Sequence, residues 1–379
     1  MRWLGRDPSR SAPVVVCAVI AIVALATGCA GPTPRSGTEV TVSHSFTGRV
    51  SMTPTGLRLD GRDWWPAGFN AYQLGTDWSV NRGCGAEVDL DKFFTRLPPR
   101  SLTRISFFSS FAINKSTGTI DFGPLDAVFA AAARHQQLIL PVLTGGPGTC
   151  EDEHFKARDW YETGWQAQKS LGGMTFADWM ATAVSRWKDQ PMLAGWEIVG
   201  EPEASICTSQ GCNWQVRDCP PGGADVLRAF FDDAGNRLRA VDATHPIFSG
   251  FIGGDQCGMK GDDYAKVGAS SQIDVLDYHD YGTSTTDFGP AGSDLPTRIK
   301  QARSLGKPIV VNEIGVEAGS CLPLQTRADQ VRSRIIEQRN AGTAAALVWA
   351  FVPDPRPDQC TFDIGYDDPL WSVIADTIN

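Results

Sequence analysis

Two hydrophobic patterns alternate along this chain. Short continuous apolar runs bounded by glycine, proline or polar clusters predict buried strands. Between them lie longer stretches in which apolar residues recur every three or four positions, which predicts amphipathic helices. The runs predict strands at 65–74, 104–108, 138–143, 195–201, 246–252, 273–281, 308–313 and 344–351.

Helical periodicity fills most of the intervals between those strands. In 122–136, for example, Leu125, Val128 and Phe129 fall on one face. The other helices are predicted at 175–188, 225–241, 295–305 and 325–340, and a hairpin-like stretch at 50–64 precedes the first strand. Strands that alternate with helices, without an internal repeat or a linker, predict one α/β domain, a single (β/α)₈ TIM barrel over residues 46–379.

The N-terminal segment does not fit the barrel pattern. An arginine-containing start leads into an apolar run at 14–26, which is too short for a comfortable membrane span. The run ends in Ala-Thr-Gly-Cys, which predicts a lipoprotein-type signal peptide at 1–28, a lipidated Cys29 and a tether at 29–45. Ala26 departs from the larger aliphatic residue that is usual there, so an ordinary cleaved signal peptide is the alternative. Both interpretations predict export.

Cysteine usage agrees with export. The chain has ten cysteines; one lies in the signal segment and Cys29 follows it, so eight remain. An even set in an exported protein predicts disulfides. The eight are Cys84, Cys150, Cys207, Cys212, Cys219, Cys257, Cys321 and Cys360. All follow predicted strands, so they fall in the long loops on the catalytic face of a barrel, which the disulfides would pin.

We expect three pairs among them: Cys321 with Cys360, Cys84 with Cys150, and Cys257 with one cysteine of the loop after the fourth strand. The alternative for that loop is a zinc site formed by Cys207, Cys212 and Cys219. Their spacing lacks the usual close cysteine pair, and no histidine lies nearby.

Charge and motif content narrow the function. The formal net charge is −9 and no basic tract occurs, which argues against a nucleic-acid partner. No Gly-x-Ser-x-Gly elbow, phosphate loop or dinucleotide fingerprint is present. A membrane would be contacted only through the lipid anchor.

Two glutamates end apolar runs in separate predicted strands. Glu201 closes the run at 195–201 and Glu313 closes the run at 308–313. A carboxylate at the end of a buried strand is costly unless it is paired or functional. Because the C-terminal ends of barrel strands meet on one face, the two predict one site. Glu197 lies on the same strand as Glu201, and we expect it to belong to the internal charge network rather than to act in catalysis.

Several short motifs of the chain resemble those of a known family. Trp-Glu-Ile-Val-Gly-Glu-Pro at 196–202 resembles the strand-four acid/base motif of glycoside hydrolase family 5, and Asn-Glu-Ile-Gly at 312–315 resembles its strand-seven nucleophile motif. The resemblance spans about residues 50–379. Other positions that fit the family are Asn70 after Gly-Phe, Arg104, His279 and Tyr281 in His-Asp-Tyr, and Trp349.

The resemblance implies a retaining, double-displacement mechanism without metal or cofactor. Glu201 would be the acid/base and Glu313 the nucleophile, with carboxyl groups about 5–5.5 Å apart. Arg104 and Tyr281 would hydrogen-bond Glu313 and keep it ionised. Trp349 would form the floor of the sugar subsite.

One position departs from the family pattern. The family normally has asparagine before the acid/base glutamate, where it binds the 2-hydroxyl of a pyranose, and this chain has Gly200. A furanose would present that hydroxyl differently. The chain further resembles exported mycobacterial β-D-galactofuranosidases, which implies the galactan of cell-wall arabinogalactan as substrate. The alternatives are a β-mannanase or β-glucanase-type pyranosidase, and a non-catalytic glycan-binding lipoprotein.

Tryptophans are candidates for contacts with sugar rings. Those in predicted loops, Trp78, Trp160, Trp165 and Trp214, either stack on substrate or pack the loops. Trp179 and Trp187 lie on the helix at 175–188 and are predicted core residues.

Overall fold

The computed structural model describes residues 47–77, 79–84, 86–170, 172–212, 216–282 and 291–378. The expected signal segment 1–28, the tether 29–45 with Cys29, and the tryptophans Trp78 and Trp214 lie outside the described residues. Within the described ranges, no helix is both long enough and apolar enough to cross a membrane.

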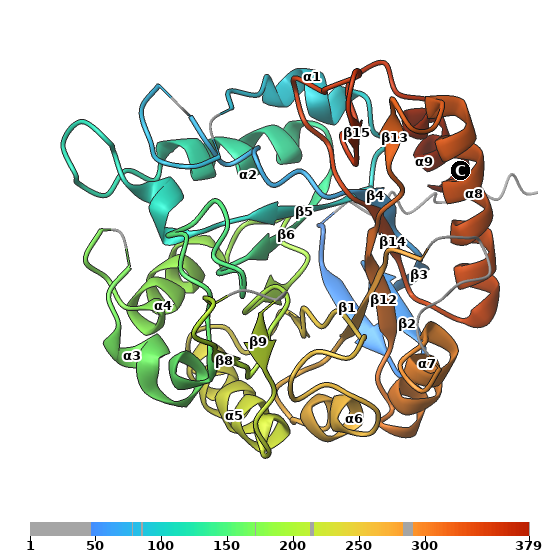
Figure 1. Cartoon of the computed structure of the whole chain (residues 1–379). Helices are drawn as coiled ribbons and strands as arrows, with labels where there is room; N and C mark the ends of the chain where they lie inside the picture. Colours follow the sequence, from blue (N-terminus) through green and yellow to red (C-terminus); the bar gives the residue numbers. More distant parts are fainter. Residues whose placement is uncertain are drawn as a thin grey trace, which may run out of the picture. The chain divides into compact units, whose positions relative to one another are not determined.

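Eight parallel strands form a closed ring with helices around it (Figure 1). The strands are β4 (Ala67–Phe69), β5 (Leu102–Ser106), β6 (Leu138–Val142), β7 (Trp196–Glu197), β10 (Ile247–Phe248), β11 (Leu276–Asp280), β12 (Ile309–Ile314) and β14 (Ala346–Val348). They form two ladders, β10-β7-β6-β5 and β11-β12-β14-β4. Parallel bridges from Asn70 to Arg104 and from Phe248 to Val275 join the two ladders at both edges. The predicted (β/α)₈ barrel is confirmed.

The longer helices lie close to their predicted positions. They are α2 (Gly123–Arg134), α4 (Phe176–Trp187), α5 (Gly223–Val241), α7 (Leu295–Ser304) and α8 (Leu324–Ala341). A further helix, α9 (Leu370–Ile378), was not predicted. The start of α4 is fixed by a capping box between Thr175 and Asp178. Two helices of six residues, α1 (Leu90–Thr95) and α6 (Asp263–Gly268), were not predicted, because so short a segment shows little periodicity.

Several strands are shorter than their apolar runs. The run at 195–201 forms a ladder only at β7, which ends at Glu197. Ile198 and Val199 are also fully buried, but they do not pair as strand. The apolar run therefore indicates which residues are buried, and not which residues pair as strand. The prediction that Glu201 ends a strand is wrong, because Glu201 lies four residues beyond β7.

Two hydrophobic cores result from the alternation of side chains along the strands. One lies inside the ring, where Leu102, Leu138 and Leu347 pack with Val50 and Leu57 of the N-terminal hairpin. That hairpin consists of the antiparallel strands β1 (Val50–Thr53), β2 (Gly56–Leu59) and β3 (Arg62–Trp64). It covers the N-terminal end of the barrel, so the opposite end is left for the site. The second core lies between strands and helices and includes Trp179 and Trp187, as predicted.

Four disulfides fasten the loops that follow the strands. They join Cys84 to Cys150, Cys207 to Cys212, Cys219 to Cys257, and Cys321 to Cys360. The three expected links are confirmed, with Cys219 as the partner of Cys257. The zinc alternative is wrong, because all three of its cysteines are oxidised.

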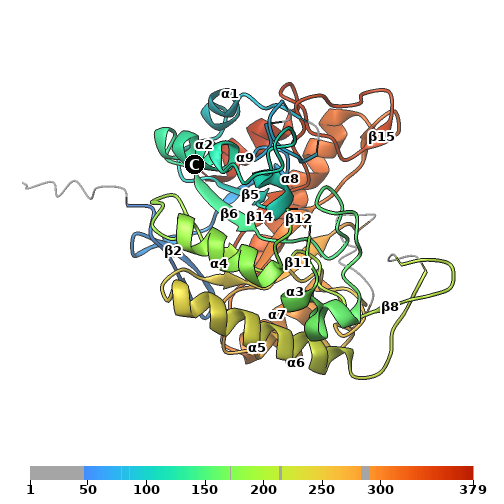
Figure 2. The ribbon, with the colours of Figure 1, turned by 90° about the vertical axis from the view of Figure 1, so that its left-hand side faces the viewer.

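Short strand pairs accompany two of the disulfides. They are β8 (Ile206–Cys207) with β9 (Arg217–Asp218), and β13 (Ala318–Gly319) with β15 (Cys360–Thr361). Figure 2 shows β8 and β15 on the same side of the barrel.

Candidate active site

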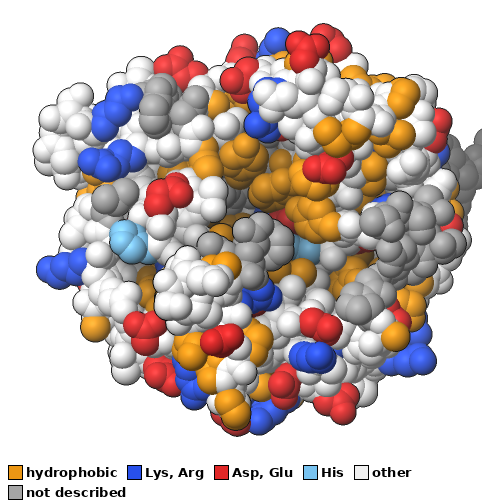
Figure 3. Space-filling model, in the orientation of Figure 1, with side chains coloured by type: hydrophobic (Ala, Val, Ile, Leu, Met, Phe, Trp, Pro, Cys, Tyr) orange, Lys and Arg blue, Asp and Glu red, His pale blue; other side chains and the backbone are white. Residues whose placement is uncertain are grey.

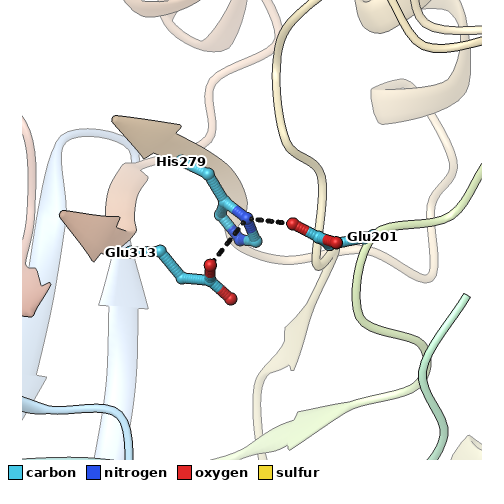
Figure 4. Close-up of side chains that lie close together, drawn as sticks. All are labelled: Glu201, His279 and Glu313. Atoms are coloured by element: carbon cyan, nitrogen blue, oxygen red, sulfur yellow. Dashed lines mark hydrogen bonds and ion pairs between the residues drawn. The ribbon is translucent and has the colours of Figure 1, made fainter. Parts of the chain in front are cut away.

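Glu201 and Glu313 converge on His279 at the C-terminal end of the barrel (Figure 4). Glu313 lies within β12 and is buried, whereas the Glu201 side chain is 30% exposed. His279 lies on β11, and its Nδ1 is 3.0 Å from Glu201 Oε1 and 3.4 Å from Glu313 Oε2. A carboxylate oxygen of each glutamate and this nitrogen all lie within 4.8 Å of one another.

That spacing has a chemical meaning. Paired carboxyls about 5–5.5 Å apart suit direct attack by one of them, whereas inversion needs a gap of about 6.5–9.5 Å for a water molecule. The pair here is too close for the second arrangement. Nδ1 is within reach of both carboxylates, so a proton on this nitrogen would lie between them.

Arg104 is the main positive partner of Glu313. Its Nη1 lies 2.6 Å from Glu313 Oε1, and its Nε and Nη2 bond both oxygens of Glu197. Glu197 is fully buried in this ion pair, as the internal-network interpretation predicted. Asn70 Oδ1 accepts a 2.9 Å hydrogen bond from Arg104 Nη1, and the Tyr281 hydroxyl donates to Glu313 Oε2. Arg104 and Tyr281 thus hold the Glu313 carboxylate directly, and Glu197 and Asn70 hold Arg104.

Two opposing effects set the protonation of the pair. Burial raises the pKa of Glu313, and this outweighs the opposing influence of His279, Arg104 and Tyr281. Partial burial also favours protonation of Glu201, but the hydrogen bond and charge of His279 prevail and lower its pKa. The expectation that Arg104 and Tyr281 keep Glu313 ionised is correct in direction, yet their effect does not exceed that of burial.

The pKa of His279 shifts in the opposite direction to that of Glu201. Burial lowers the pKa of the imidazole, but the charges of Glu313 and Glu201 and the hydrogen bond to Glu201 raise it above its ordinary value of 6.5. These two shifts favour a proton on His279 rather than on Glu201.

The backbone of Glu201 is held by neighbouring loops rather than by a strand ladder. Its φ is 57°, in the left-handed region that costs a non-glycine residue on the order of 1 kcal/mol. The Glu201 N–H donates to the Gly250 carbonyl at 2.8 Å, and the Gly200 carbonyl accepts from Gly146 at 2.7 Å. These bonds from both sides hold a conformation that a free loop would leave.

The absence of a side chain at Gly200 also matters for packing. A Cβ at this position would lie 3.0 Å from Arg104 Nη2 and 3.3 Å from Glu197 Oε1. Any side chain would therefore crowd the buried ion pair that supports Glu313. Asparagine here would require Arg104 or its partner to shift.

A cavity of about 330 Å³ surrounds the two glutamates. Trp349 and Tyr72 form one wall, with their rings stacked at 5.6 Å and 11°. The loop 145–150 also lines the cavity, and the Cys84–Cys150 disulfide fastens it. Hydrophobic side chains gather around a hollow near the middle of this face (Figure 3). Tyr72 was not predicted, although an aromatic residue two positions after Asn70 was the available signal.

Five of the predicted site residues line this cavity, namely Arg104, Gly200, Glu201, Glu313 and Trp349. The other three, Asn70, His279 and Tyr281, form hydrogen bonds with residues of its lining. The described loop tryptophans line no part of it. Trp160 and Trp165 are buried against Phe230, so they pack the loops instead of offering a face to a sugar.

Glu201, His279 and Glu313 also have the spacing of possible metal ligands. The same atoms are already engaged with one another, and Glu313 is further engaged with Arg104 and Tyr281. The chemistry that this set supports without any added group is proton transfer at Glu201 and nucleophilic attack by Glu313.

No family model matches the chain, but several known proteins are similar to it. It is similar to a probable mannan endo-1,4-beta-mannosidase F of Aspergillus flavus, with 25% identity over 335 residues that cover 77% of this chain and 64% of that protein. It is also similar to mannan endo-1,4-beta-mannosidase F of Aspergillus clavatus, with 24% identity, covering 80% and 72% of the two chains. The chain thus spans less than two thirds of the length of the Aspergillus flavus protein.

Solved structures share the fold. The endo-1,4-beta-mannanase from Rhizomucor miehei superposes with a TM-score of 0.63 at 17% identity, over 87% of this chain and 99% of that one. A glycoside hydrolase family 5 mannosidase from the same organism gives 0.61 at 16% identity, over 88% and 97%. At these identities the likeness establishes the barrel.

Proposed function

We propose that this protein is a retaining glycoside hydrolase of the family 5 type. The observation that carries the proposal is the close approach of Glu201 and Glu313, which share His279 Nδ1 at 3.0 and 3.4 Å. The names of the relatives and of the matching structures point to the same reaction class.

In the first step Glu313 attacks the anomeric carbon as the bond to the leaving oxygen breaks. Glu201 gives its proton to that oxygen, and His279 supplies the proton to Glu201. The product is a glycosyl ester of Glu313. Because the ester is neutral, one of the two charges that His279 faces disappears.

In the second step Glu201, now a carboxylate, takes a proton from water. The water oxygen bonds to the anomeric carbon, and the ester bond to Glu313 breaks. Arg104 and Tyr281 hold the departing carboxylate in position, so Glu313 regains its charge among fixed donors.

For the sugar, β-1,4-linked mannan is the first candidate, because relatives and matching structures alike carry mannosidase or mannanase names. The second candidate is a β-D-galactofuranoside such as cell-wall galactan. Gly200 favours it, because this position offers no side chain to a pyranose 2-hydroxyl and a side chain here would crowd Arg104.

We further propose that the protein works outside the cytoplasm. Four disulfides favour an oxidising compartment. Attachment through a lipid at Cys29 follows from the sequence pattern, and mass spectrometry of the mature N-terminus would test it.

The test of the function is hydrolysis of three aryl glycosides, the β-D-mannopyranoside, the β-D-glucopyranoside and the β-D-galactofuranoside. We expect turnover of one of them, and a loss of at least about 1,000-fold in Glu313→Gln. Release from the mannoside alone would select the first sugar, and release from the furanoside alone would select the second. Equal turnover by Glu313→Gln and wild type would contradict the mechanism. Binding of glycan without turnover of aryl or oligomeric substrates would indicate the non-catalytic alternative.

A further inference from the structure

We propose that a second, charged sugar-binding subsite lies beside the catalytic cavity, across the Tyr72–Trp349 stack, with Arg356 and Glu317 as its polar groups. It would bind the sugar next to the one held at the catalytic pair, so the substrate would be a glycan chain rather than a single residue. The inference rests on the proposed function and specifies its substrate further.

The subsite is a cavity of its own. It measures about 240 Å³ and shares Tyr72 and Trp349 with the 330 Å³ catalytic cavity. Its lining is Tyr72, Glu317, Trp349, Ala350, Val352, Arg356, Cys360, Thr361, Phe362 and Asp363. Because both aromatic residues are only partly buried and line both spaces, a chain that enters one cavity can continue over their edges into the other. Aromatic surface combined with a few polar groups is typical of sugar sites.

Arg356 is fixed in this cavity by Asp363. Its Nε and Nη2 each donate a 2.7 Å hydrogen bond to one oxygen of the Asp363 carboxylate, and the side chain stays 58% exposed. A guanidinium has five N–H donors in a planar fork, and these two bonds use two of them. A held, exposed fork suits neighbouring hydroxyls on a sugar ring. Glu317 is exposed on the same cavity and adds acceptors.

The walls are preformed. Glu317 precedes β13, which pairs with β15, and the Cys321–Cys360 disulfide joins the same two segments. A rigid subsite loses less conformational entropy when it binds a ligand. Phe362 meets the ring of Tyr281 edge-on at 5.3 Å, and Tyr281 donates to Glu313. One wall of the second cavity therefore supports Tyr281, which holds the Glu313 carboxylate of the first.

The path does not stop at this subsite. A further cavity of about 430 Å³ shares Arg356, Thr361 and Asp363 with it and reaches Lys92 on α1. Arg356 thus borders two neighbouring cavities, the second of which shares no lining residue with the catalytic cavity. This arrangement suits a polymer that extends beyond two sugars.

The experiment compares chain lengths. Arg356→Ala and Glu317→Ala are assayed on an aryl monosaccharide glycoside and on β-1,4-manno-oligosaccharides of two to six units, or on galactofuranosyl oligomers if the furanoside is the substrate. Arg332→Ala is the matched control, since Arg332 is a half-exposed arginine on α8 that pairs with Asp376. We expect KM for the oligosaccharides to rise roughly ten-fold more than KM for the aryl glycoside, because hydrogen bonds to a charged group are lost. The control should not separate the two substrates.

Two outcomes would overturn the subsite. One is an equal loss on short and long substrates with a lowered Tm, which would mean that Arg356 only supports its loop. The other is no change on either substrate in both variants.

A second readout keeps the subsite separate from the function. Titration of oligosaccharides into the Glu313→Gln protein, with and without Arg356→Ala, measures affinity without turnover. Normal turnover with a length-independent effect of Arg356→Ala refutes the subsite alone. Full activity of Glu313→Gln refutes the proposed mechanism, whatever Arg356 does.

Discussion

The two glutamates of the site are held in different ways. Glu313 lies inside β12, a six-residue strand paired on both sides, and is 5% exposed as a side chain. Glu201 lies beyond β7, has a left-handed backbone and is 30% exposed. The barrel itself therefore fixes one carboxylate, and loops fix the other.

This difference suits different tasks. A nucleophile must meet the anomeric carbon in one position, and a strand surrounded by Arg104 and Tyr281 provides that position. An acid/base must reach the leaving oxygen in one step and water in the next, so it needs access to solvent. On this argument the strand residue is the nucleophile and the loop residue is the acid/base.

The largest expected effect tests that assignment. Glu201→Ala should slow hydrolysis of an aryl glycoside with a good leaving group by roughly 100-fold or more, since it removes acid/base catalysis. Added azide should restore turnover in this variant, because a small anion attacks the glycosyl ester without needing a base. Azide should not restore Glu313→Ala with retention of configuration, which product analysis by NMR would show. Rescue with retention at position 313 instead would reverse the roles.

The next effect concerns the residue that couples the two. His279→Asn should lower kcat by roughly 10- to 100-fold, since the proton shared with Glu201 is lost. The wild-type alkaline limb belongs to the His279–Glu201 pair and should lie above 6.5, because both carboxylates raise the pKa of His279. In the variant only Glu201 holds the proton, so the limb should move to lower pH.

The pH–rate profile of kcat/KM measures this shift. A uniform drop in activity with an unmoved alkaline limb would show that His279 only positions Glu201. Asparagine keeps a side-chain donor, so loss of the hydrogen bond alone does not account for a moved limb.

Prediction from the sequence worked best where one local pattern fixes the structure. Glu313 follows an apolar run that forms a full strand, so both its element and its burial could be predicted. Glu201 follows a similar run, but its conformation depends on bonds from Gly146 and Gly250, which the pattern does not contain. Tyr72 and Arg356 were missed for a related reason. Tyr72 acquires its position by stacking on Trp349, and Arg356 by pairing with Asp363 beside that stack, and neither contact has a local signal.

Beneath Glu313 lies another buried carboxylate, which separates stability from catalysis. Asp277 accepts hydrogen bonds from Ser249 and Gly250, and Asn312 donates to its other oxygen. Burial, together with the charge of Glu197, raises the pKa of Asp277 to about 7. The Asn312 side-chain oxygen has no hydrogen-bond partner among the described residues. If the Asn312 amide turned over, that oxygen would accept from a protonated Asp277.

The change that should affect activity least acts on stability and follows from this carboxylate. Its pKa is about 7 when folded, against an ordinary value of 3.8, so between these values the folded state binds more protons than the unfolded state. The free energy of unfolding therefore falls as pH rises from about 4 to 7. Asp277→Asn should flatten that fall, by on the order of 1 kcal/mol for each pKa unit of the shift. Asparagine can donate to the turned Asn312 oxygen and keep the contacts from Ser249.

Urea unfolding at several pH values would measure this change, with Asp376→Asn, an exposed carboxylate on α9, as the control. An unchanged slope in Asp277→Asn would mean that Asp277 is ionised throughout. Activity of Asp277→Asn near wild type, together with a flatter dependence of the free energy of unfolding on pH, would show that Glu313 needs the shape of the Asp277 side chain and not its charge. Glu201, which depends on the charge of His279, would then differ from Glu313 in the kind of support as well as in its backbone.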